Sequence, residues 1–135
     1  MPSALVALSV AATLLLTGCG GRGSAENGHV ADTATRFLAA AASAPESGCD
    51  LLAPATLEQL ESDDEQCADA IGEVGSGGTP TSGEPRVEVY GRDAIVRWAD
   101  QTLFLANFDA GWRVTAAGCE PRGKDLPYDC TIEGR

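Results

Sequence analysis

The apolar residues of this chain change their spacing near residue 86, and this change restricts the fold more than any other feature. Between Val30 and Ala41 they recur every three or four residues, which is the period of an amphipathic helix. From Arg86 to Ala116 they alternate with other residues, which is the period of a strand. We therefore expect helices first and an antiparallel sheet after them, an α+β arrangement.

The helical part is predicted in several pieces. The first helix begins at Val30 and stops before Pro45, and its inward face consists of Val30, Ala34, Phe37, Leu38 and Ala41. Cys49 to Ile71 is predicted as two or three short helices, with Pro54 in a first turn. Ser62 is a candidate N-cap, and Glu65 would complete its capping box. The glycine-rich stretch 72–84 is predicted to be a surface loop.

The second part predicts four short strands joined by tight turns, in a curved antiparallel meander. Their apolar positions lie within 86–90, 94–98, 103–108 and 112–116. The third strand is apolar on both faces, so we expect it to be covered on both. Trp98 and Trp112 are expected in the core. The tail from Gly118 is predicted to be a polar loop that needs a covalent staple.

The charge balance bears on possible partners. Nine Lys and Arg face twenty Asp and Glu, which gives a net charge of −11. Nucleic acid is therefore not expected as a partner, because phosphate binding requires a basic patch. The acidic cluster Asp63, Asp64, Glu65 and Asp69 is a candidate cation site, but it lacks the spacing of a calcium loop. We favour a solvated helical face there, and predict no metal and no cofactor.

The N-terminal segment is predicted to be a secretory signal. Ala4 to Leu16 is almost entirely apolar, but it is shorter than the roughly 20 residues of a transmembrane helix. The next residues, Leu16-Thr17-Gly18-Cys19, resemble the lipobox of bacterial lipoproteins. The resemblance implies cleavage before Cys19 and a diacylglycerol on its thiol. An ordinary secretory signal with an incidental cysteine, or a buried N-terminal helix, is the alternative.

This resemblance sets the expected organisation of the chain. Residues 1–18 form the signal peptide, 19–28 the lipidated cysteine and a flexible tether, and 29–135 one folded domain. The expected location is the extracytoplasmic face of the cell membrane, with the lipid bilayer bound through Cys19.

The other cysteines are Cys49, Cys67, Cys119 and Cys130. An even number in a small exported domain indicates two disulfides, for which three pairings are possible. We favour the sequence-local pairing, Cys49–Cys67 and Cys119–Cys130. A four-thiolate zinc site is the competing interpretation, but the close C-x2-C pairs of such sites are missing.

Several stretches together resemble a family of small exported actinobacterial proteins with an NTF2-like, cystatin-related cone fold. They are Cys49–Thr56, Cys67–Ala70, Thr102–Leu105, Gly111–Cys119 and Pro127–Cys130. The resemblance implies the cone fold, export and the local pairing of the cysteines. It implies no reaction.

We therefore predict a non-enzymatic domain without catalytic residues, acting through a small ligand or a membrane or cell-wall protein. The alternative is a pocket enzyme of the isomerase or hydrolase kind, which requires a buried carboxylate with a raised pKa inside the cone. The single histidine, His29, is predicted to be solvent-exposed rather than a catalytic base.

Overall fold

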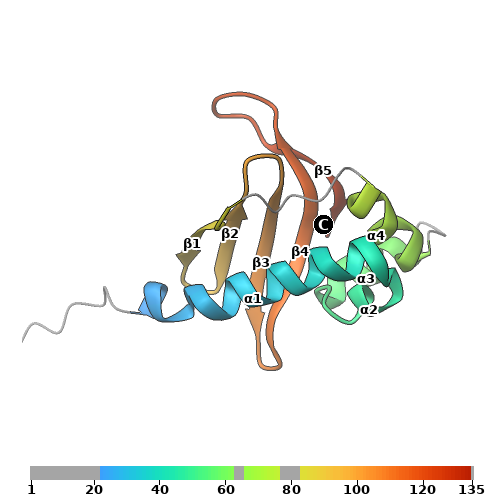
Figure 1. The fold of residues 1–135 in the computed structure, drawn as a ribbon, viewed down its shortest axis with the longest axis horizontal. Coiled ribbons are helices and arrows are strands. Elements are labelled where there is room, and N and C mark those ends of the chain that lie inside the picture. The colour runs from blue at the N-terminus through green and yellow to red at the C-terminus, as the bar shows by residue number, and fades with distance from the viewer. Residues whose placement is uncertain (1–21, 63–65, 77–82, 135) are drawn as a thin grey trace, which may run out of the picture.

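The computed structural model describes residues 22–62, 66–76 and 83–134, which form helices and one sheet (Figure 1). The helices are α1 (Arg22–Ser43), α2 (Pro45–Cys49), α3 (Pro54–Ser62) and α4 (Cys67–Ser76). The strands are β1 (Arg86–Tyr90), β2 (Asp93–Arg97), β3 (Thr102–Phe108), β4 (Gly111–Pro121) and β5 (Tyr128–Glu133). All described helices precede the strands, which confirms the α+β class.

The five strands form one antiparallel sheet in the order β1-β2-β3-β4-β5. The prediction of four strands is therefore wrong, because most of the tail that was expected to be a loop is strand. β4 continues past Ala116 to Pro121 and offers its free edge to β5, in which Cys130 lies opposite Cys119. β3 lies at the centre of the sheet, but the prediction that both its faces are covered is met only in part, because no described helix lies over the face of Phe104, which is half-buried.

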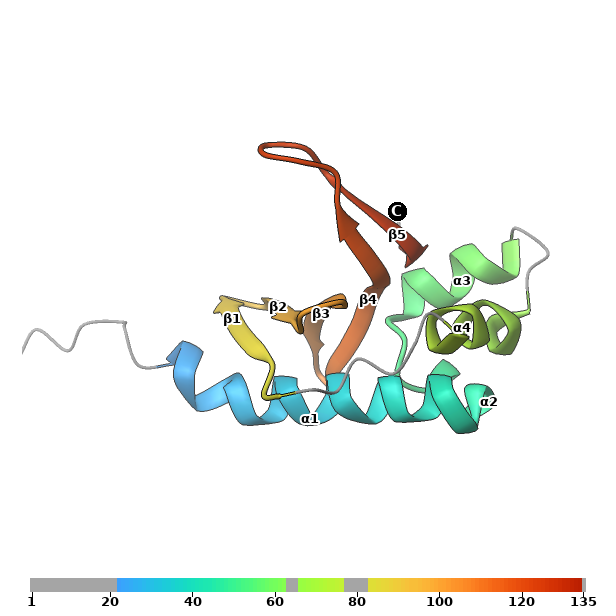
Figure 2. The ribbon, with the colours of Figure 1, turned by 45° about the horizontal axis from the view of Figure 1, so that its top comes forward.

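The core lies between α1 and the sheet. Figure 2 shows α1 running across one face of the sheet, with the other helices beside β4 and β5. The predicted inward face of α1 is confirmed, because all its members are buried: Val30, Ala34, Phe37, Leu38 and Ala41. They meet the sheet residues Val96, Leu103, Leu105, Val114 and Ile132. Burying side chains of this size contributes about 1.5–3 kcal/mol each.

The N-terminal part of α1 differs from the prediction. Residues 20–28 were expected to form a flexible tether, but α1 begins at Arg22 and includes most of them. Tertiary contacts favour the helix here. Glu26 Oε2 accepts a hydrogen bond of 2.9 Å from the indole N–H of Trp112, which is only 7% exposed. A buried indole N–H requires an acceptor, and packing determines helix stability in proteins more than glycine content does.

The short helices are fixed to both α1 and the sheet. The Cys49–Cys67 disulfide joins the end of α2 to the start of α4. Between α2 and α3, Leu52 forms a parallel bridge with Val114, and the N–H of Ala53 donates to the Val114 carbonyl at 2.8 Å. This segment therefore extends the sheet beside the first half of β4. Pro54 begins α3, as predicted.

Two predictions about this region are wrong. Ser62 is the last residue of α3 and not an N-cap, because its hydroxyl donates to the Gln59 carbonyl at 2.8 Å within the same helix. α4 continues to Ser76, inside the stretch predicted to be a loop, because Val74 is buried against the core. Glu65, the other member of the predicted capping box, lies outside the described residues.

β4 is strongly bent. Its register against β3 shifts on both sides of Phe104, and Gly118 has a φ of +65° in the part that shifts. Bulges of this kind bend a strand and increase its twist. Figure 2 shows the result: β4 and β5 turn away from α1, and the loop between them projects from the molecule. The Cys119–Cys130 disulfide lies near the base of this hairpin, with a Cα–Cα distance of 4.0 Å.

Candidate binding face

The candidate site lies on the face of the sheet turned away from α1, which we call the outer face. On β1, β2 and β3 its side chains alternate with those of the core and lie opposite one another in the ladder. They include Arg86, Glu88, Tyr90, Asp93, Ile95, Arg97, Thr102 and Phe104. None of the four described helices covers this face (Figure 2). It is therefore the part of the sheet that is open to a partner.

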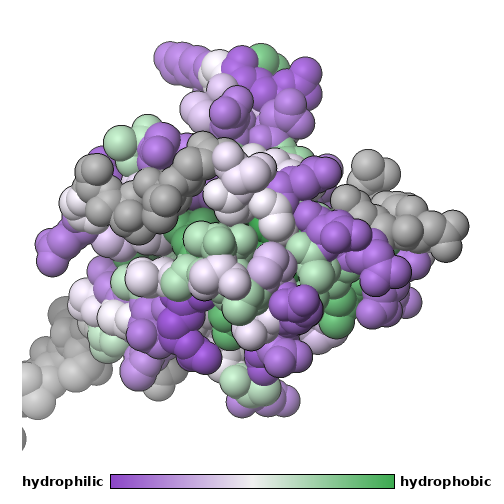
Figure 3. Space-filling view, turned by 45° about the vertical axis from the view of Figure 1, so that its right-hand side comes forward, coloured by the Kyte–Doolittle hydropathy of each residue, from purple (hydrophilic) through white to green (hydrophobic). Residues whose placement is uncertain are grey.

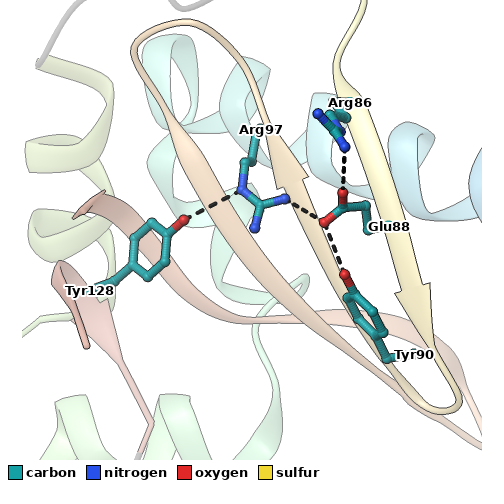
Figure 4. A network of polar contacts seen from close by, with 5 residues as sticks. All are labelled: Arg86, Glu88, Tyr90, Arg97 and Tyr128. Atoms are coloured by element: carbon teal, nitrogen blue, oxygen red, sulfur yellow. Dashed lines mark hydrogen bonds and ion pairs between the residues drawn. The ribbon is translucent and has the colours of Figure 1, made fainter. Parts of the chain in front are cut away.

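A network of polar side chains crosses the outer face (Figure 4). The carboxylate of Glu88 is at its centre and accepts from Arg97 Nη1 at 2.6 Å and from the Tyr90 hydroxyl at 3.0 Å. Its other oxygen lies 3.0 Å from Nη2 of Arg86. Arg97 Nε donates to the hydroxyl of Tyr128 at 3.4 Å, which links β2 to β5. The network thereby spans the five strands of the sheet, with side chains from β1, β2 and β5.

The network changes the acidity of three of its members. Hydrogen bonds from Arg97 and then Tyr90 hold the pKa of Glu88 below its ordinary value. Donation to Glu88 raises the pKa of Tyr90. The pKa of Arg97 is raised, mainly by Tyr128 and then by Glu88. At neutral pH Glu88 is therefore a carboxylate, Tyr90 a neutral phenol and Arg97 a guanidinium.

The bend of β4 brings Tyr128 over the centre of the sheet. Its ring meets Phe104 edge to face, with centroids 5.1 Å apart and an interplanar angle of 79°. Such pairs contribute about 0.5–1.5 kcal/mol beyond area burial. Ile95, beside Phe104 in the ladder, is 6% exposed. The outer face therefore has an apolar floor, with the polar network around it.

A cavity of about 410 Å³ adjoins Arg97 and Tyr128. Its other lining residues come from the loop between β2 and β3 and from the end of β4, and they include Trp98, Thr102 and Pro121. Trp98 is half-buried and also packs against the core, so the prediction that it lies in the core is confirmed in part. The same prediction for Trp112 is confirmed, because Trp112 is buried. The volume is in the range of small-ligand sites in proteins, about 300–1,000 Å³.

The site residues that the sequence analysis singled out do not belong to the outer-face network. The structure joins Cys49 to Cys67 and Cys119 to Cys130, the pairing that the sequence favoured. Cys19 lies outside the described residues, so its lipidation stays a prediction. His29 is exposed, as predicted.

The two alternative functions, cation binding and catalysis in a pocket, both require carboxylates. Asp63, Asp64 and Glu65 also lie outside the described residues, and Asp69 is exposed on α4. Within the described ranges, no group of three His, Cys, Asp or Glu side chains is placed to hold a metal ion. The buried polar side chains of that same part are Thr33, Thr56 and Thr102, none of which is a carboxylate.

The sequence analysis did not identify the outer-face network as a site. A signal was present, because Arg86, Glu88 and Tyr90 alternate with Val87 and Val89. A two-residue turn after Tyr90 places Arg97 opposite Arg86, so the three Glu88 contacts follow from the alternation along β1 and the hairpin register. The contact with Tyr128 could not be found in this way, since it depends on a fifth strand and on the bend of β4.

The remaining surface offers less specific features. A cavity of about 560 Å³ lies between α1 and the turn before Trp112 and includes His29 and Asp32. Another, of about 550 Å³, lies beside the Cys49–Cys67 disulfide. The face in Figure 3 shows hydrophobic residues in small areas between hydrophilic ones. The outer face is the stronger candidate, because a polar network and an adjoining cavity lie together there.

Comparison of the chain with protein-family models, with curated proteins and with solved structures finds no match in any of the three. The site therefore has to be interpreted from its own geometry.

Proposed function

We propose that this chain is an exported lipoprotein, held at the extracytoplasmic face of the cell membrane by a lipid on Cys19. Its folded domain is a non-enzymatic binding module, and the outer face is the surface that binds. The ligand is a small molecule or a segment of a membrane or cell-wall protein.

The two disulfides are the observation that carries the proposal. All four cysteines of the described chain are paired, at Cys49–Cys67 and Cys119–Cys130. Structural disulfides of this kind persist in oxidising compartments outside the cytosol. The pairing leaves Cys19 as the one cysteine not taken up by a disulfide. This agrees with a chain in which that cysteine has another covalent use.

Attachment through lipid agrees with two further features. None of the described helices is both long and apolar enough to cross a bilayer. The net charge of −11 opposes binding to anionic headgroups, so acyl chains have to supply the attraction.

The early start of α1 adds a restriction on the partner. Only Gly20 and Gly21 stand between Cys19 and the first helical residue, Arg22. Three residues span at most about 10 Å when fully extended. A domain lipidated at Cys19 is therefore held close to the bilayer, which favours partners located at the membrane surface.

The cone fold is part of the same proposal. A long helix across one face of a bent antiparallel sheet is the arrangement that an NTF2-like fold requires. The bend of β4 at Gly118 and the projecting hairpin support this assignment.

Cell fractionation tests the proposal. We expect the wild-type chain in the membrane fraction, soluble only in detergent, and the Cys19→Ser variant in the soluble fraction. Cys119→Ser is the control: it removes a disulfide cysteine, so the protein should stay with the membrane and be less stable by about 3 kcal/mol. If Cys19→Ser fractionates like the wild type, the lipoprotein assignment is wrong.

A further inference from the structure

The guanidinium of Arg97 has hydrogen-bonding capacity that the fold does not use. Nη1 is occupied by Glu88 and Nε by Tyr128. No contact within the described residues uses Nη2, and Figure 4 shows this nitrogen directed away from both partners. The Arg97 side chain is 35% exposed. A planar guanidinium with one free edge is suited to an incoming group that accepts hydrogen bonds.

Beside Arg97, the rest of the network has an occupied carboxylate and a second donor that is free. Glu88 accepts from three groups, Arg97, Tyr90 and Arg86, so its two oxygens are largely occupied. Tyr128 accepts from Arg97, which leaves its own O–H free to donate outward. Of the residues that line the adjoining cavity, Arg97 is the one with a cationic side chain, so a negative group would bind at Arg97.

The adjoining cavity places apolar surface next to these donors. Arg97 and Tyr128 line it together with Trp98 and Pro121, and its volume is about 410 Å³. Two carboxylate residues, Asp100 and Glu120, also line it and are exposed. Both carboxylates repel anions, so they disfavour a polyanion most, and a single carboxylate group has to lie at Arg97 and Tyr128.

We propose that this cavity binds an organic monocarboxylate with an apolar body. The carboxylate accepts from Arg97 Nη2 and the Tyr128 hydroxyl, and the apolar body packs against Trp98 and Pro121. The inference deepens the proposed function and rests on it, since it names the ligand class of the outer face. Two sources share this chemistry: a free aromatic or aliphatic acid, and the C-terminal carboxylate of a polypeptide.

The test is an NMR titration of the full chain in detergent solution, following the side-chain N–H of the arginines. The ligands are 3-phenylpropionate and N-acetyl-Ala-Phe with a free carboxylate, each compared with its neutral amide. We expect saturable shifts at Arg97 and binding at least tenfold weaker for the amides, because a charge-assisted hydrogen bond is lost. Tighter binding of the dipeptide identifies a chain end as the ligand, and tighter binding of 3-phenylpropionate identifies a free acid.

Three variants make the assignment specific. Arg97→Gln should weaken binding about tenfold or more, and Tyr128→Phe about threefold, while Tyr128→Phe keeps the ring on Phe104. Arg36→Gln is the control: it removes the same charge from α1, where Arg36 pairs with Asp32, and it does not line the cavity. It should bind as the wild type does.

The proposal is overturned if neither acid shifts the side-chain N–H resonance of Arg97 at concentrations up to about 50 mM. This limit is well above the dissociation constant of about 1 mM that a weak ligand has. Equal binding of acid and amide, or equal weakening by Arg97→Gln and Arg36→Gln, also overturns it. Membrane fractionation of Arg97→Gln separates the two proposals. This variant should remain membrane-bound. Loss of ligand binding in this variant would therefore leave the conclusion about the lipid anchor unchanged.

Discussion

Replacing Gly118 by alanine tests whether the bend of β4 builds the outer face. Gly118 has a φ of +65°, and a Cβ there would lie 2.5 Å from Oγ1 and 2.8 Å from Cβ of Thr131 on β5. Gly91, in the turn between β1 and β2, is the matched control. It has a φ of +64°, and no atom lies within 4 Å of a Cβ built on it. The two substitutions therefore share the backbone conformation and differ in the space around the new methyl group.

The expected magnitudes follow from these two terms. Left-handed backbone costs an L-residue about 1–2 kcal/mol, and the loss of freedom in the unfolded chain returns about 0.4–1 kcal/mol. Gly91→Ala should therefore destabilise by about 1 kcal/mol or less. Gly118→Ala carries an overpacking cost of roughly 1–3 kcal/mol in addition, which gives about 2–4 kcal/mol in total. Gly118→Ala should therefore have a melting temperature roughly 5–15 °C below that of Gly91→Ala.

The assay is chemical and thermal unfolding of both variants with the disulfides intact. A second readout is the side-chain N–H resonance of Arg97, which should move in Gly118→Ala because β5 carries its partner Tyr128. In Gly91→Ala this resonance should stay in place. If the two variants agree in stability within about 0.5 kcal/mol, Gly118 does not make the close approach described, and the account of the bend is wrong.

Three other substitutions, the first of them with a matched control, test separate parts of the structure. Gly75→Ala should destabilise by about 1–3 kcal/mol in a urea titration, because a Cβ would lie 2.2 Å from a backbone oxygen of α1. Gly72→Ala in the same helix has a nearest atom at 3.9 Å and should stabilise by up to about 1 kcal/mol; equal effects would contradict the crossing of the two helices. Glu88 has a lowered pKa in the folded chain, so its contribution is present above the unfolded pKa of about 4.3 and is lost as the pH falls through the lower folded value. Stability between pH 5 and pH 2 should therefore fall less steeply in Glu88→Gln than in the wild type, and identical slopes would show that the network does not form in solution. Trp112→Phe removes the hydrogen bond to Glu26 and should speed amide exchange over residues 24–29 about tenfold, a loss of about 1.4 kcal/mol. If these amides in the wild type already exchange as fast as in an unfolded chain, the residues form a flexible tether and not a helix.

Local patterns predicted the parts of the fold that depend on one element and its core. The inward face of α1 from Val30 to Ala41 follows from helical spacing, and the central place of β3 follows from its two apolar faces. Both statements need only a period and the requirement that apolar side chains be buried.

The parts that were missed depend on contacts between distant segments. Residues 22–28 are helical because Glu26 meets Trp112, which lies far along the chain. β5 forms on an edge that exists only because β4 continues beyond Ala116, although the alternation of Tyr128, Cys130 and Ile132 is a usable signal. The outer-face network divides in the same way: the Glu88 contacts follow from a hairpin register, whereas the Tyr128 contact follows from a bend.

The most direct test of the central claim is the intact mass of the protein purified from membranes, measured after treatment with a thiol-alkylating reagent without prior reduction. We predict a chain that begins at Cys19, carries a diacylglycerol and takes up no alkyl group, because the other four cysteines form two disulfides. A chain that takes up one alkyl group and carries no lipid would show that Cys19 is a free thiol. The membrane anchor and the location proposed from it would then both be wrong.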